Sequence, residues 1–114
     1  MFSQQFWSEY QTLVLQRQTE AFNHVVAPCK IGFALSKMHP SLEISKKLIE
    51  IINQRNLENI SKLNQIDIFM FIKFLQSPRV QLECKDSSNK HLNLELIWPI
   101  VVGELTKSHV KNLD

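Results

Sequence analysis

The side chains of this chain that could do chemistry are few and scattered. Six could act as nucleophiles, bases or metal ligands: Cys29, Cys84, His24, His39, His91 and His109. Only His24 and Cys29 lie close together in sequence, and no second ligand pair follows at the spacing of a zinc site. Neither Gly32 nor Gly103 belongs to a nucleophile elbow or a phosphate-binding loop. Cys29 could pair with a distant histidine for catalysis, but a small buried thiol is the commoner role of such a residue. We therefore predict no enzyme, no catalytic or metal-binding residue, no cofactor and no small-molecule substrate.

The composition is that of one globular domain spanning residues 1–114. Hydrophobic residues make up 44% of the chain and charged residues 21%, which argues against disorder. The net charge of +2 is too small to indicate a nucleic-acid partner by itself. The two cysteines fit free thiols in a reducing cytosol, and a single disulfide is the alternative. The N-terminus has no signal-peptide pattern, and the apolar run 66–75 is too short to cross a bilayer. These features predict a soluble cytoplasmic protein without a membrane segment.

Two stretches have clear helical periodicity. Residues 3–25 predict an amphipathic helix with Ser3 as its N-cap and with Phe2 and Trp7 at the spacing of a hydrophobic staple. Residues 41–55 predict a second helix, with Ser41 as its cap, that continues through residues 56–63. The inner positions of these helices are apolar: Phe6, Tyr10, Leu13, Val14, Ala21, Val25, Ile44, Leu48, Ile51 and Ile52.

Two other apolar stretches fit either a helix or a buried strand. Residues 28–38 begin with Pro28, which suits the first turn of a helix. Residues 66–75 are the most apolar part of the chain, interrupted only by Asp67 and Lys73. Asn64 is a candidate N-cap for this segment, and Asp67 suits the positive end of a helix dipole. We predict helices for both, and we expect 66–75 to be covered on two sides.

Residues 79–98 alternate between polar and apolar side chains, which predicts a β-hairpin. The loop lies over residues 86–90, and Pro99 ends the second strand. Residues 100–112 then predict a closing helix. The expected fold class is α+β: a mostly helical domain of about four to five helices, with one antiparallel hairpin at 79–98 packed on them and a C-terminal helix.

The class of function follows largely by elimination. The expected function is that of a small protein-binding protein, namely an adaptor, an inhibitor or a chaperone-like binder, whose partner is another protein or a second copy in a homodimer. Aromatic residues concentrate in the first ten positions, and exposed aromatics are typical interface anchors. The predicted anchors are Phe2, Trp7 and Tyr10, although the same side chains could instead complete the core.

The alternative is a winged-helix-like nucleic-acid-binding regulator. Helices at 41–54, 56–63 and 65–76 followed by a hairpin have the element order of a winged helix. The third helix, however, offers Phe69, Met70 and Phe71 where a groove needs polar and basic side chains. If this alternative holds, the contact residues are Lys46, Lys47, Arg55, Lys62, Lys85 and Lys90.

Overall fold

The described part of the chain is entirely helical. The structure, a computed structural model, describes residues 3–38, 44–85 and 88–113, with side chains up to Lys107. Its helices are α1 (Gln4–Gln16), α2 (Gln18–Ala21), α3 (Ala27–Leu35), α4 (Lys46–Glu58), the 3₁₀ helix η1 (Ile60–Lys62), α5 (Gln65–Leu75), α6 (Pro78–Cys84) and α7 (Leu94–Leu113). No strand occurs among these residues, so the prediction of an α+β fold with a β-hairpin is wrong.

The predicted hairpin at 79–98 is replaced by α6, a turn and the first residues of α7. Val80 and Cys84 are buried, whereas Leu82 is 61% exposed. A spacing of four satisfies both the strand and the helix period, so the alternation over seven residues could not separate the two. In α7 the buried side chains are Ile97 and Val101, again four apart. The alternation had instead assigned the apolar positions of the second strand to Leu92, Leu94, Leu96 and Trp98.

Of the two prolines of this region, Pro78 follows the end of α5 and Pro99 does not end an element as predicted. Pro78 occupies the first turn of α6, where its missing N–H would have no intrahelical partner. Pro99 lies inside α7, which starts at Leu94 and not near residue 100. Pro99 has no N–H, so the carbonyl of Glu95 lacks its usual helical donor. Both residues are exposed, and water can solvate that carbonyl instead. Asn93 supports the start of the helix, because its Oδ1 accepts a hydrogen bond from the Glu95 N–H at 3.0 Å.

The N-terminal helices agree with the prediction in type and differ in length. Ser3 caps α1 as predicted, and its Oγ accepts a hydrogen bond from the Phe6 N–H at 3.2 Å. The predicted helix over 3–25 is divided, because α1 stops at Gln16 and only the short α2 follows. The prediction of a helix over 28–38 is confirmed by α3, and Pro28 lies in its first turn. Phe2 and Ser41 lie outside the described residues.

The most apolar segment is confirmed as a helix. α5 begins at a complete capping box, in which Asn64 Oδ1 accepts from the Asp67 N–H at 2.8 Å and Asp67 Oδ2 accepts from the Asn64 N–H at 3.3 Å. This reciprocal pair satisfies two backbone donors at the helix start. This local helix-start signal therefore outweighed the strand preference of the Ile and Phe residues in the segment.

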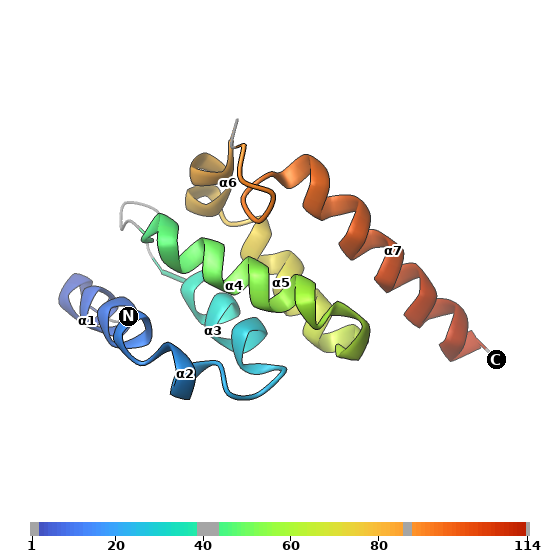
Figure 1. The fold of residues 1–114 in the computed structure, drawn as a ribbon, viewed down its shortest axis with the longest axis horizontal. Coiled ribbons are helices and arrows are strands. Elements are labelled where there is room, and N and C mark those ends of the chain that lie inside the picture. The colour runs from blue at the N-terminus through green and yellow to red at the C-terminus, as the bar shows by residue number, and fades with distance from the viewer. Residues whose placement is uncertain (1–2, 39–43, 86–87, 114) are drawn as a thin grey trace.

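The helices enclose two neighbouring apolar clusters. One joins α1, α3, α4, α5 and α6 around Leu48, Ile52 and Phe74. The other joins α3, η1, α5 and α7 around Phe71, Leu75 and Ile97. The contact of α3 with α5 is the most extensive between any two helices, and both lie centrally, whereas α1 and the C-terminal end of α7 lie at opposite sides of the molecule (Figure 1).

Candidate functional site

Several outer helix faces carry large apolar side chains. More than a third of each such side chain remains exposed, and they come from α1, α5, α6 and α7: Phe6, Leu13, Ile66, Phe69, Leu82, Leu96, Ile100 and Val102. Scattered exposed apolar residues are common in soluble proteins, whereas groups of them on one face indicate a contact surface. The groups on α5 and α7 are therefore the candidates.

The outer patch of α5 consists of Ile66, Phe69 and Lys73. Ile66 is 71% exposed and Phe69 is 54% exposed. Spacings of three and four residues place all three side chains on one face of the helix. The Lys73 Nζ lies 5.3 Å from the centroid of the Phe69 ring, in a cation–π contact. The expectation that this segment is covered on both sides is therefore met only on its inner face, where Phe71, Phe74 and Leu75 are fully buried.

The segment that carries this patch has a positive charge balance in sequence. Between residues 60 and 76 the charged residues are Lys62, Asp67 and Lys73. Asp67 is only 6% exposed and its carboxylate is used in the capping box, whereas both lysines are exposed. Among the described residues the one ion pair joins Lys107 to Glu104, so neither lysine of this segment has a carboxylate partner there. The patch thus combines apolar surface with one uncompensated cation, Lys73, and a second exposed lysine, Lys62, precedes it in the sequence at the end of η1.

The outer stripe of α7 consists of Leu96, Pro99, Ile100 and Gly103, all exposed. These residues recur at helical spacing on the side opposite Ile97 and Val101. A Cβ at Gly103 would meet no atom within 4 Å, so the helix surface is open there. Unlike the α5 outer patch, this stripe contains no charged residue.

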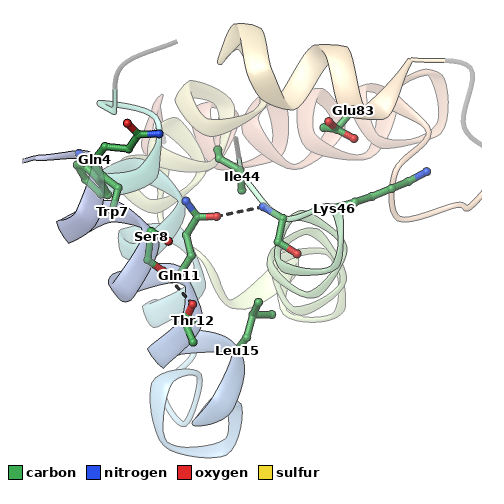
Figure 2. Close-up of a pocket in the computed structure, with 10 residues that line it drawn as sticks. Gln4, Trp7, Ser8, Gln11, Thr12, Leu15, Ile44, Lys46 and Glu83 are labelled. Atoms are coloured by element: carbon green, nitrogen blue, oxygen red, sulfur yellow. Dashed lines mark hydrogen bonds between the residues drawn. The ribbon is translucent and has the colours of Figure 1, made fainter. Parts of the chain in front are cut away.

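A polar cleft separates α1 from the start of α4 and from α6 (Figure 2). It has a volume of about 600 Å³, and its lining residues are Gln4, Trp7, Ser8, Gln11, Thr12, Leu15, Ile44, Ser45, Lys46 and Glu83. The Gln11 Oε1 bridges it by accepting a hydrogen bond from the Ser45 N–H at 3.0 Å, while Lys46 extends away from α1. The lining offers hydroxyl, amide and charged groups but neither a histidine nor a cysteine, so it has no nucleophile–base pair of the kind considered for Cys29.

Both cysteines are free thiols with low reactivity. Cys29 donates a hydrogen bond from Sγ to Asn56 Oδ1 at 3.0 Å, and burial, with a smaller effect of the Asp67 carboxylate, raises its pKa to about 12. The pKa of Cys84 is raised to about 11, mainly by burial and then by Glu83, against a lowering effect of Lys46. A protonated buried thiol is a poor nucleophile. Within the described ranges, no three His, Cys, Asp or Glu side chains are grouped so that they could hold a metal ion.

The predicted anchors of the first helix have different environments. Trp7 is buried in the core, with its ring edge-on to Phe6 at 5.3 Å and to Tyr10 at 5.9 Å between centroids. Tyr10 is half-buried, and burial raises the pKa of its hydroxyl. Because α1 turns Trp7, Gln11 and Val14 inward, the apolar side chains it presents to solvent are Phe6 and Leu13. Phe2 is outside the described residues.

The predicted basic contact residues do not share one element. Lys46 and Lys47 open α4, Arg55 lies in its last turn and Lys62 lies in η1. Lys85 and Lys90 follow α6, in the segment expected to form a wing. Since that segment is helix and turn where it is described, the winged-helix arrangement is not present in this part of the chain.

Ile66 and Phe69 were not among the contact residues predicted from the sequence. A signal was available in Lys73, which follows Ile66 by seven residues and Phe69 by four. A charged side chain must point to solvent or to a partner charge, so the lysine identifies the outer face of an otherwise apolar helix.

Comparisons with known proteins do not assign this chain to a class, so its function is inferred from its fold and its surfaces. No family model matches the chain, and neither a curated protein nor a solved structure is significantly similar to it. None of the described helices is long and apolar enough to cross a membrane.

Proposed function

We propose that this chain is a small non-enzymatic protein-binding protein, acting as an adaptor, an inhibitor or a chaperone-like binder. The observation that carries the proposal is the α5 outer patch, where Ile66 and Phe69 remain 71% and 54% exposed on the most apolar helix. Aromatic and aliphatic side chains held on a rigid helix are typical anchors of protein interfaces. Covering them with a partner would remove apolar surface from water, which favours association.

The α7 outer stripe supports the same class of function, since Leu96 and Ile100 are 51% and 45% exposed. We assign no partner to it. Two free cysteines are compatible with a reducing compartment, and we place the protein in the cytoplasm as part of the proposal. Nucleic-acid binding is not proposed, because the basic residues considered for it are distributed over several elements.

Site-specific photocrosslinking in the cells that produce the protein tests this proposal. A photoreactive amino acid replaces Ile66 in one variant and Gln16, an exposed polar residue of α1, in a control variant. We expect a discrete adduct with another protein from position 66 and none from position 16. The adduct should weaken when Phe69→Ser is added, and the captured protein, once purified, should bind the wild-type chain and not the Phe69→Ser variant.

Equal adducts at both positions, or none at either, would contradict the proposal. An adduct between two copies of the chain would assign the patch to a homodimer, which remains a protein–protein function. Phe69 is exposed, so its replacement by Ser should change the free energy of unfolding by no more than about 0.5 kcal/mol. Urea unfolding of the variant verifies that its fold is intact.

A further inference from the structure

The partner of the α5 outer patch can be specified further by its chemistry. We infer that this patch binds an amphipathic helix whose apolar residues are flanked by acidic side chains. This inference rests on the proposed function and concerns the same surface. Its three supports are the shape of the patch, its charge and the way its lysine is held.

The shape of the patch favours a helical partner. Ile66 and Lys73 are seven positions apart along α5, or about 10 Å at the helical rise, and Phe69 lies between them. The backbone N–H and C=O groups in the middle of a helix are already paired, so a partner cannot extend them as an added strand. It must pack side chains against this stripe, and an amphipathic helix presents apolar residues at the matching spacings of three and four.

The charge of the patch favours acidic flanks on that helix. Lys73 belongs to the patch and lies against Phe69, and it has no carboxylate partner among the described residues. Lys62, which also lacks one there, precedes the patch in the sequence. A partner with Glu or Asp beside its apolar residues would complement Lys73, whereas a basic helix would add like charge. Such rim charges contribute more to selectivity and to the rate of association than to affinity. The acidic character therefore determines which helix binds, and Ile66 and Phe69 supply most of the affinity.

The position of the Lys73 side chain is fixed by its contact with the Phe69 ring. Its Nζ lies 5.3 Å from the Phe69 centroid, so the ammonium and the ring share one side of the patch. A partner side chain that covers the ring also comes close to the ammonium, and the exclusion of water there strengthens an ion pair. Replacing Lys73 should consequently alter charge selectivity, while replacing Phe69 should remove binding of either kind.

An anionic membrane is the other surface that could attract cations beside apolar side chains. Stable attachment at a membrane interface needs a large apolar face together with several basic residues. The segment from 60 to 76 offers two exposed lysines and two strongly exposed apolar side chains. This is too little for a bilayer, and it is sufficient for a transient contact with one helix.

Binding of two matched synthetic peptides tests the inference. Both are amphipathic helices of about 18 residues with the same leucines at spacings of three and four, and they carry either Glu or Lys at every flanking position. Fluorescence anisotropy measures their affinity for the full chain at about 50 mM and about 300 mM salt. We expect the Glu peptide to bind more tightly, and its advantage to shrink at the higher salt concentration.

The variants then separate the apolar contribution from the charge. Phe69→Ser should weaken the Glu peptide about tenfold or more, as expected for an interface anchor. Lys73→Glu should reduce the preference for the Glu peptide or reverse it. Lys85→Glu, an equal change of charge at an exposed position outside the patch, should leave both affinities unchanged.

Equal or tighter binding of the Lys peptide would overturn the inference, as would an equal effect of Lys73→Glu and Lys85→Glu. Binding to phosphatidylglycerol vesicles that requires Phe69, without binding of the Glu peptide, would replace it with a membrane contact. If neither peptide binds while the crosslink from position 66 persists, the inference fails and the protein-binding function stands. Loss of both would remove the function as well.

Discussion

At the scale of single residues, Cys29 shows how burial determines chemistry in this protein. The thiol is fully buried between α3 and its neighbours and donates to Asn56, itself a fully buried residue of α4. A buried thiolate would lack solvation and would lie near the Asp67 carboxylate, so the proton is retained and the pKa rises to about 12. Cys29 therefore joins two helices and is not available as a nucleophile.

We expect thiol-specific labelling of native Cys29 at about pH 8 to be at least 100-fold slower than in the unfolded chain. The physical reason is twofold, since a thiol with a pKa of about 12 is almost wholly protonated at that pH and the side chain is inaccessible. Mass spectrometry of a Cys84→Ala variant, with and without denaturant, measures the rate for Cys29 alone.

The reciprocal Cys29→Ala variant serves as the control, because its labelling rate is that of Cys84 alone.

The pKa of Cys29 is raised on folding, so the stability that its buried protonated form contributes is complete below the pKa of the unfolded thiol. This stability decreases as the pH rises from about 9 toward about 12. Alkaline destabilisation should therefore be shallower in the Cys29→Ala variant. Labelling of native Cys29 at the unfolded rate would refute this assignment.

At the scale of elements, the contact of α3 with α5 depends on one glycine. A Cβ at Gly32 would lie 3.0 Å from Phe74 Cγ and 3.2 Å from Cδ1, closer than packed carbon atoms normally approach. Phe74 is fully buried at this contact. The absence of a side chain at Gly32 thus allows the two central helices to pack closely.

Gly32→Ala should destabilise the protein by about 1–3 kcal/mol, because the buried Phe74 ring has little room to move away. Gly103→Ala is the matched control, since both glycines are helical but a Cβ at Gly103 meets nothing within 4 Å. That variant should be stabilised by up to about 1 kcal/mol through helix propensity. Urea unfolding measures both changes, and a neutral or stabilising Gly32→Ala would refute the close packing.

The elements also show what the sequence could and could not predict. The helix over 66–75 was predictable because Asn64 and Asp67 form a capping box, a signal contained in four consecutive residues. The segment 79–98 was not, because Val80 and Cys84 fit both periods and the exposure of Leu82 depends on neighbouring helices that no local pattern reveals. For the candidate site, Lys73 marks the outer face of α5 in the sequence, but the degree to which Ile66 and Phe69 remain exposed on that face follows only from how α5 packs.

At the scale of the whole molecule, the helices are not equally well anchored. α3 and α5 form the most extensive contact at the centre, whereas α1 lies at the edge and joins the core through Trp7, Val14 and the hydrogen bond from Ser45 to Gln11 (Figures 1 and 2). Regions with few buried contacts open at lower free energy than the core does. α1 should therefore be the part of this fold that separates most readily from the rest.

Trp7→Ala tests this hierarchy of stability. The ring is buried, so its removal should cost about 3–5 kcal/mol. Phe6→Ala is the matched control, because the neighbouring ring is 39% exposed and should cost less than about 1 kcal/mol. Hydrogen exchange followed by mass spectrometry should find α1 less protected than α3 and α5 in the wild-type chain.

In the Trp7→Ala variant, exchange should accelerate first and most strongly in α1, while α3 and α5 keep a higher protection than α1. An equal loss of protection in all three helices would mean that the molecule opens as one unit. If Trp7→Ala changed neither the free energy of unfolding nor the exchange rate of α1, the Trp7 ring would not be what holds α1 in place. The result bears on function too, because α1 contributes Trp7 and Val14 to one apolar cluster but no residue to the α5 outer patch. A variant whose α1 opens while peptide binding to α5 is retained would separate the binding surface from the edge of the fold.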